Sequence, residues 1–239
     1  MRLDIALVAR GFFESRTRAV RAIREGMVKV NGIIRKKSSD EVSEADMIEA
    51  EDPLPYVSRG GLKLCHAMRQ FQINVTGMRA IDIGASTGGF TEVLLARGAA
   101  EVVCVDVGSG QLAPKLRKDK RVVNLEKTDI RNFPVDRYPP FAFACVDVSF
   151  ISLNHILPFL NPLLISGGRA VCLVKPQFEV GRQYLNKKGV VKDPARALAA
   201  AEAICTAEEQ KGFQVIGLTA SPIKGGDGNT EYLMALLHF

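Results

Sequence analysis

The fold is decided by one stretch of the chain, Ala80-Ile81-Asp82-Ile83-Gly84-Ala85-Ser86-Thr87-Gly88-Gly89-Phe90-Thr91. An apolar run with one acid breaks here into glycines, which indicates a buried strand, a tight turn and the start of a helix. Further along, apolar runs alternate with helix-like segments that begin at Gly88, Ile151 and Pro194. This alternation predicts an α/β fold in which helices cover both faces of a mostly parallel sheet. The expected strands are 79–84, 101–107, 122–129, 141–150, 167–176, 213–223 and 230–239.

The composition is that of a soluble globular protein, with 47% hydrophobic and 24% charged residues among 239. No apolar run reaches the ~20 residues that a membrane-spanning helix needs, and charges interrupt the start of the chain, where a signal peptide is apolar. We therefore expect a cytoplasmic protein without a membrane span. The five cysteines form no C-x-x-C pair, which indicates reduced, mostly buried thiols.

Basic residues gather at the N-terminus. Residues 1–37 carry ten Arg and Lys against three acids, whereas residues 38–52 carry seven acids and no base. The overall charge of +6 would also fit a solvated surface, but this segregation is typical of a nucleic-acid-binding face.

The same region has the pattern of a small α+β domain. A short apolar-periodic helix is followed by a second helix that Ser15 is expected to cap and that carries arginines at three- and four-residue steps. Gly26 ends this helix, and Asn31-Gly32 predicts a two-residue hairpin turn.

A change in composition marks the end of this domain. Prolines and the Gly60-Gly61 pair interrupt the chain, so we place the boundary near Tyr56 and expect domains at 1–55 and 56–239. The basic residues that we expect to contact nucleic acid are Arg2, Arg16, Arg18, Arg21, Arg24, Lys36, Lys37 and Arg59.

The glycine turn excludes two kinds of phosphate site. A dinucleotide fingerprint needs a glycine where this chain has Ser86, and no G-K-[ST] follows, as a Walker loop requires. A ligand without a phosphate, such as S-adenosylmethionine, fits better. The expected cofactor-binding residues are Asp82, Gly84, Ala85, Ser86, Thr87, Gly88, Gly89, Phe90, Asp106, Val107, Asp129 and Ile130.

Acids stand at three successive strand ends. Asp82 is expected to meet the ammonium group of the cofactor, Asp106 both ribose hydroxyls, and Asp129, or its backbone, the adenine amine. The alternative is that these aspartates only stabilise turns or cap helices.

Two ionisable residues end strongly apolar strands. Asp147 follows the run 141–146 and Lys175 follows the run 170–174, at the strand ends where doubly wound folds place their active sites. Adjacent strands would let the two charges neutralise each other, and a purely structural ion pair remains the alternative. Lys63 and Glu231 form a second pair of opposite charges, and each alone would usually be a surface charge.

Several motifs together resemble a known family. The segments "YVSRGGLKL", "DIGASTGGFT", "VDVGSGQL", "DVSFISL", "LVKPQFE", "KGVVKDP" and "SPIKGGDGNTEYL" are similar to the TlyA, or hemolysin A, family of FtsJ-like ribosomal RNA methyltransferases. The N-terminal pattern resembles the RNA-binding domain named after ribosomal protein S-four.

The resemblance implies a Rossmann-like methyltransferase domain whose last strand is antiparallel. It implies S-adenosylmethionine as cofactor, ribosomal RNA or ribosomal subunits as partners, and methylation of a ribose 2′-oxygen, with cytidine as the nucleoside. The FtsJ-like catalytic tetrad carries over to Lys63, Asp147, Lys175 and Glu231. One departure is that Thr87-Gly88-Gly89-Phe90 stands where the broader group has Pro-Gly-Gly-Trp, which leaves the RNA target open.

Other functions make different demands on the sequence. A base N-methyltransferase favours an Asn/Asp-Pro-Pro-aromatic turn where this chain has residues 147–150, and a carbon methyltransferase would need Cys145 as nucleophile. A membrane-active hemolysin and a non-catalytic ribosome-assembly factor also stay open as alternatives. No metal is expected, because His66, His155 and His238 lack ligand spacing.

Overall fold

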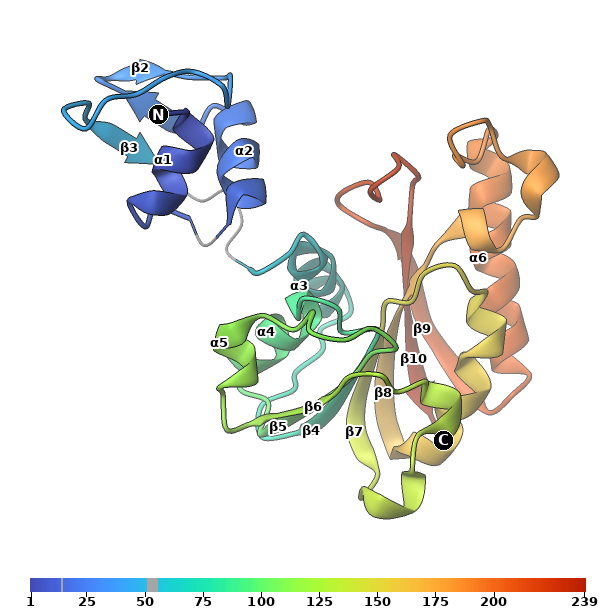
Figure 1. Cartoon of the computed structure of the whole chain (residues 1–239). Helices are drawn as coiled ribbons and strands as arrows, with labels where there is room; N and C mark the ends of the chain where they lie inside the picture. Colours follow the sequence, from blue (N-terminus) through green and yellow to red (C-terminus); the bar gives the residue numbers. More distant parts are fainter. Residues whose placement is uncertain (14, 51–55) are drawn as a thin grey trace. The chain divides into compact units, whose positions relative to one another are not determined.

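The computed structural model describes residues 1–13, 15–50 and 56–239. The chain divides into two units, Met1–Pro55 and Tyr56–Phe239, which are described separately (Figure 1). The five cysteines are free thiols.

The first unit is a helix pair followed by a small antiparallel sheet. The Ser15 side chain accepts a hydrogen bond from the backbone N–H of Arg18 at 3.4 Å, which confirms the expected cap. Asn31 and Gly32 both have positive φ, 54° and 77°, as the predicted two-residue hairpin turn requires. The elements are α1 (Leu3–Ala9), α2 (Arg16–Arg24), β1 (Val28–Val30), β2 (Ile33–Ile34) and β3 (Ile48–Ala50), with strand order β2-β1-β3.

The second unit is built on a seven-stranded sheet of order β6-β5-β4-β7-β8-β10-β9. Its first five strands are parallel, and β10 runs antiparallel to both β8 and β9, so the predicted mostly parallel sheet is confirmed. The strands are β4 (Arg79–Ile83), β5 (Glu101–Val105), β6 (Val122–Leu125), β7 (Phe141–Val146), β8 (Leu164–Val174), β9 (Phe213–Ala220) and β10 (Tyr232–His238).

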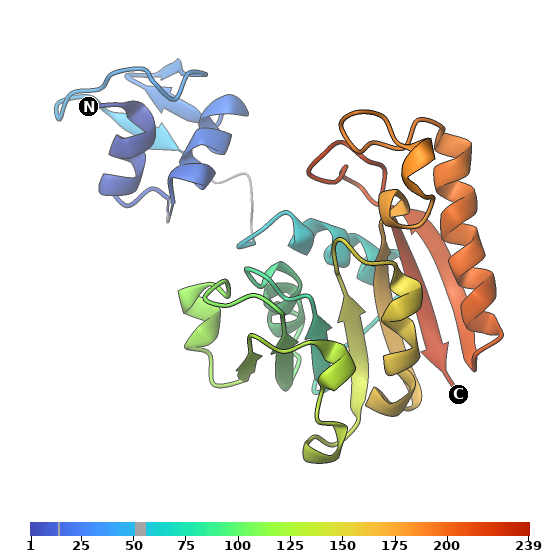
Figure 2. The ribbon, with the colours of Figure 1, turned by 45° about the vertical axis from the view of Figure 1, so that its right-hand side comes forward.

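Alternate strand residues face opposite sides of the sheet, and each face has its own apolar core. On one face, α3 (Gly60–Gln70) and α4 (Gly89–Ala96) bury residues against β4, β5 and β7. On the other face, α6 (Pro194–Glu209) packs against β9 and β10 (Figure 2). A short helix, α5 (Pro114–Arg117), precedes β6.

The prediction of a helix that begins at Ile151 is wrong in detail. The chain forms three successive 3₁₀ turns instead, Leu153–His155, Leu157–Phe159 and Asn161–Leu163. Pro158 and Pro162 lie in the second and third of these turns. Proline has no N–H to donate and clashes with the preceding turn, so a continuous α-helix cannot form there.

The sheet order reverses direction at β4, whose neighbours are β5 and β7. Crevices at such switch points are where doubly wound folds bind ligands. Gly84 leaves β4 with φ of 83°, and a Cβ on it would clash with the backbone carbonyl of Asp147 after β7. The turns after these two strands therefore meet closely enough to require glycine.

No helix in the described part of the chain is long and apolar enough to cross a membrane.

Candidate active site

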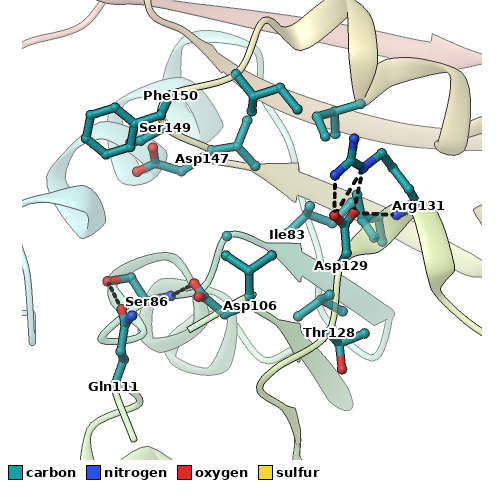
Figure 3. A pocket seen from close by; sticks show the side chains of 17 residues that line it. Ile83, Ser86, Asp106, Gln111, Thr128, Asp129, Arg131, Asp147, Ser149 and Phe150 are labelled. Carbon is teal, nitrogen blue, oxygen red and sulfur yellow. Dashed lines mark hydrogen bonds and ion pairs between the residues drawn. The ribbon is translucent and has the colours of Figure 1, made fainter. Parts of the chain in front are cut away.

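Two adjoining cavities lie at the carboxyl ends of the parallel strands. The larger, of about 500 Å³, is lined by the turns after β4, β5, β6 and β7 (Figure 3). The smaller, of about 230 Å³, is lined by the start of α3, the glycine turn and Asp147. Gly84, Ser86 and Asp147 line both cavities, so a ligand in one would adjoin a ligand in the other.

Asp106 lines the larger cavity and shapes its wall. One carboxylate oxygen accepts the backbone N–H of Ser86 at 2.8 Å, and the other accepts that of Gly108 at 2.7 Å. Each carboxylate oxygen has further acceptor capacity for a hydroxyl, as the ribose assignment requires. Val107 follows at the rim, with 73% of its surface exposed.

Asp129 and Ile130 also line the larger cavity, as expected of cofactor-binding residues. The Asp129 carboxylate already holds the Arg131 guanidinium at 2.5 Å, and this hydrogen bond lowers the pKa of the acid. Arg131 itself lines the cavity, although the sequence analysis did not predict it as a site residue. The backbone at 129–130 is therefore better placed than the Asp129 carboxylate to meet a neutral amine.

The structure differs from the expectation at Asp82, which lines neither cavity. Its side chain is fully buried on the α4 face of the sheet, where one oxygen accepts the Thr91 hydroxyl at 2.6 Å. The other oxygen has no hydrogen-bond partner among the described residues. Burial raises the pKa of Asp82 to about 6. Asp82 therefore stabilises the glycine turn through its hydrogen bond with Thr91 instead of lining a ligand cavity.

The glycine turn faces the smaller cavity. Ala85, Thr87, Gly89 and Phe90 contribute to its wall, whereas Gly88 lies outside the wall and is the N-cap of α4, with φ of 93°. A Cβ on Gly89 would meet the Ser58 hydroxyl at the start of α3. Close packing of the turn against the segment that leads into α3 thus explains why residue 89 is a glycine.

The four predicted catalytic residues form two buried ion pairs. Lys175 Nζ lies 2.6 Å from Asp147 Oδ1 and donates to Ser149 Oγ at 2.7 Å. Lys63 Nζ donates to Glu231 Oε2 at 2.5 Å. Lys63, Lys175 and Glu231 retain only 8%, 9% and 3% of their exposed surface.

Each pair reaches the smaller cavity through one member: Lys63 and Asp147 line it, whereas their partners Glu231 and Lys175 line neither cavity. An ammonium group and a carboxylate in one cavity wall can orient a hydroxyl group and stabilise charge that develops on its oxygen.

Glu126 was not predicted as a site residue. Its carboxylate accepts the backbone N–H groups of Gly110, Gln111 and Leu112 at 2.7, 2.9 and 3.1 Å, and these bonds lower its pKa to about 2. The loop that it holds carries Gln111, which lines the larger cavity. The only signal in the sequence is a glycine-rich segment whose free N–H groups need an acceptor.

Phe150 is a second residue that the sequence analysis missed. It lines the larger cavity, is 92% exposed and has a φ of 65°, a left-handed backbone that is rare for a bulky residue. Its ring lies 5.5 Å from that of Phe178. Strain and exposure of this kind mark a candidate ligand contact.

The first unit sorts the predicted RNA-binding residues into two groups. Asp4 is buried and pairs with Arg2 at 3.0 Å and Arg16 at 2.7 Å, which lowers its pKa to about 2. Arg21 pairs with Glu25 on the same helix.

The second group is free to meet an anion. Arg24, Lys36 and Lys37 are exposed and form no ion pair with the residues that the structure describes. Arg18 is half-buried, and Arg59 belongs to the second unit, where it lines the smaller cavity.

A carbon methyltransferase that uses Cys145 as nucleophile finds no support in this geometry. Cys145 lies fully buried inside β7 and lines neither cavity, and burial raises the pKa of its thiol well above the ordinary value. Among the described residues, no group of three or more His, Cys, Asp or Glu is arranged to hold a metal ion.

Comparison with known families divides the chain at the same place. Residues 56–237 match the FtsJ-like methyltransferases and residues 1–48 match the S4 domain. The 16S/23S rRNA (cytidine-2'-O)-methyltransferase TlyA of Mycobacterium tuberculosis is 43% identical, over 98% of this chain and 89% of that protein. Hemolysin A of Brachyspira hyodysenteriae is 38% identical, over 98% of each chain.

A solved structure agrees with this relationship. A Streptococcus thermophilus protein provisionally named a hemolysin is 43% identical and has a TM-score of 0.78, with 100% of this chain and 88% of that chain covered. The chain belongs to the TlyA, or hemolysin A, group of FtsJ-like methyltransferases, in which the methyltransferase domain follows an S4 domain.

Proposed function

We propose that this protein methylates a ribose 2′-oxygen of ribosomal RNA, at a cytidine, with S-adenosylmethionine as methyl donor. The single observation that carries the proposal is that two lysine–carboxylate pairs, the buried Lys63–Glu231 and the partly buried Lys175–Asp147, each contribute one residue to the wall of one cavity. The relative from Mycobacterium tuberculosis is named for the same reaction on 16S and 23S rRNA.

The larger cavity fits the methyl donor. Its volume of about 500 Å³ suits a nucleoside-sized ligand. Asp106 would accept the ribose hydroxyls, and the backbone at Ile130 would meet the adenine. When bound, S-adenosylmethionine supplies an electrophilic methyl group on a sulfonium.

The smaller cavity would receive the target nucleotide. Lys175 Nζ, which lies 2.6 Å from Asp147 in the cavity wall, would reach the 2′-oxygen, hold it in line with the methyl group and stabilise the negative charge that develops as the hydroxyl proton passes to solvent water. Asp147 and Ser149 fix the direction of the Lys175 side chain. Lys63, held by Glu231, would position the hydroxyl or the neighbouring phosphate.

Phe150 gives this assignment an aromatic surface for the base. RNA-modifying enzymes that act on single nucleotides stack unpaired bases on aromatic side chains, and this ring is exposed beside Asp147.

The test is methyl transfer from labelled S-adenosylmethionine to ribosomal subunits isolated from cells that lack the protein. We expect label in 2′-O-methylcytidine, identified by digestion to nucleosides and mass spectrometry. A variant with Lys175→Ala should bind the methyl donor and transfer no label at the wild-type enzyme concentration. Label on a base, or no transfer by the wild-type protein to either subunit, would refute the proposal.

A further inference from the structure

The second unit, Tyr56–Phe239, carries several exposed cations that form no ion pair with any residue in the described ranges. Some other exposed cations in this unit hold a carboxylate, as Lys115, Arg117 and Arg121 do within 3.2 Å, and others, such as Lys118 and Lys120, are unpaired but line neither cavity. We name as the basic band the unpaired cations at the start of α3 and on the loops 175–193 and 221–231; it comprises Arg59, Arg182, Lys187, Lys188, Lys192 and Lys224.

The loop that carries most of the band is internally braced. The Asn186 side-chain oxygen accepts the backbone N–H groups of Lys188 and Val190 at 2.8 and 3.0 Å. The Asn186 backbone N–H donates to the Val190 carbonyl at 2.8 Å. Adjacent lysines at 187 and 188 thus sit on a turn whose shape is fixed by its own hydrogen bonds, which reduces the ordering cost of binding.

A buried asparagine ties this loop to the active site. Asn229 is 2% exposed; its side chain accepts the backbone N–H of Val191 at 2.9 Å and donates to the Gly189 carbonyl at 3.0 Å. Two residues later, Glu231 pairs with Lys63. The basic loop and the catalytic pair are therefore anchored by the same short segment.

The rest of the basic band lies at the start of α3 and on the loop that precedes Asn229. Arg59 lines the smaller cavity together with Lys63, and its guanidinium lies 3.8 Å from where a Cβ on Gly226 would stand. Lys224 occurs on the same loop as Gly226. Cations thus flank the catalytic pair from α3 to the braced loop.

Most acids on these loops have partners. Glu179 accepts from the Ser152 hydroxyl and the backbone of Leu153, Asp193 caps α6 and Glu231 pairs with Lys63, whereas Asp227 is exposed and has no partner among the described residues. Neither loop presents a large exposed hydrophobic side chain within the described residues. A protein partner or a membrane would require apolar contact area, whereas a polyanion requires only unpaired cations.

We propose that the basic band binds the RNA phosphates that flank the target nucleotide, as a second RNA-binding surface separate from the S4 domain. This inference rests on the proposed function, because the target nucleotide is placed at the Lys63 pair. Such a surface would explain how a single nucleotide is held at the cavity while the S4 domain contacts RNA elsewhere.

The test uses the full-length protein with Lys187→Gln and Lys188→Gln combined. Its matched control is Lys118→Gln with Lys120→Gln, which removes the same charge from exposed lysines that also lack ion pairs and line neither cavity. Binding to protein-free ribosomal RNA is measured between 50 and 300 mM salt. In parallel, binding to vesicles of phosphatidylglycerol and phosphatidylcholine and the affinity for S-adenosylhomocysteine are measured.

Each phosphate contact contributes about 0.7–0.9 to the slope of log affinity against log salt, so the double variant should lose roughly 1.5 units of slope. Its RNA affinity should fall about tenfold at 100 mM salt, with cofactor affinity unchanged and the control variant like wild type. A slope equal to that of the control, or loss of vesicle binding without loss of RNA binding, would overturn the proposal. Reduced RNA binding in a protein whose wild type transfers no methyl group would support the band and refute the proposed function, so the two failures are distinguishable.

Discussion

Replacing Lys175 with alanine tests the chemistry more directly than any other change. The side chain is 9% exposed, its Nζ lies 2.6 Å from Asp147 and 2.7 Å from Ser149, and both contacts vanish with it. A positioned group that assists proton transfer contributes about 10²–10⁴ in rate, which is roughly 3–5 kcal/mol of transition-state stabilisation. We therefore expect single-turnover methyl transfer to fall by about two to four powers of ten, while both ligands still bind.

The same change leaves the Asp147 carboxylate without its cation. Breaking a fully buried pair costs roughly 3–5 kcal/mol, but Asp147 keeps 23% of its side chain exposed, so water can solvate it and we expect about 2 kcal/mol. Lys211→Ala is the matched control, because Lys211 pairs at 2.7 Å with Glu208, which is 1% exposed and lies outside both cavities.

The assay is single-turnover methylation of ribosomal subunits, with urea unfolding of each variant at the same temperature. Lys211→Ala leaves the fully buried Glu208 without its cation, so it should destabilise the protein more than Lys175→Ala does. It should nevertheless retain the wild-type rate of methyl transfer, whereas Lys175→Ala should lose it. Near wild-type turnover by a folded, ligand-binding Lys175→Ala would remove Lys175 from the chemistry and leave the tetrad unsupported.

Three further changes separate the parts of the site. Glu126→Gln should loosen the loop that Glu126 holds and weaken cofactor binding by roughly tenfold in calorimetry; Glu101→Gln, on the distant Arg79 pair, should not, and equal losses would contradict the role. Because the folded pKa of Asp82 is raised from 3.8 to about 6, wild-type stability should fall by up to about 3 kcal/mol as the pH rises from 4 to 6. Asp82→Asn should abolish that contribution, and parallel urea-unfolding profiles of the two proteins between pH 4 and 7.5 would refute it. Phe150→Ala should slow RNA methylation at saturating S-adenosylmethionine by roughly ten- to a hundredfold, whereas Phe239→Ala should behave as wild type; equal methylation rates would exclude base stacking.

The sheet was predictable because each strand is an apolar run bounded by turn residues. β4, β5 and β7 are buried on both faces, so their sequences are almost continuously apolar and stand out from the helices between them. The segment from Ile151 was harder, because its apolar spacing suits a helix while its two prolines deny it the backbone hydrogen bonds. The apolar spacing therefore predicted a helix that the two prolines prevent from forming.

The catalytic set could be proposed from the sequence because charges at the ends of apolar strands are costly to bury without partners. Lys175 and Asp147 follow adjacent parallel strands, and the register of β7 and β8 brings them together. Lys63 and Glu231 came from the family resemblance, since nothing local joins the start of α3 to the start of β10. Their contact depends on the antiparallel insertion of β10 beside β8, a pairing that is set by the whole sheet.

Asp82 shows why residue type and strand-end position are insufficient to assign a ligand contact. Successive side chains on β4 point to opposite faces, so Ile81 and Ile83 lie in one core while Asp82 enters the other beside Thr91. Two of the acids that line the larger cavity instead stand one residue beyond a strand, Asp106 after β5 and Asp147 after β7. An acid inside the strand instead bonds the first turn of α4 and holds the glycine turn in place. Its raised pKa follows from this burial within the core.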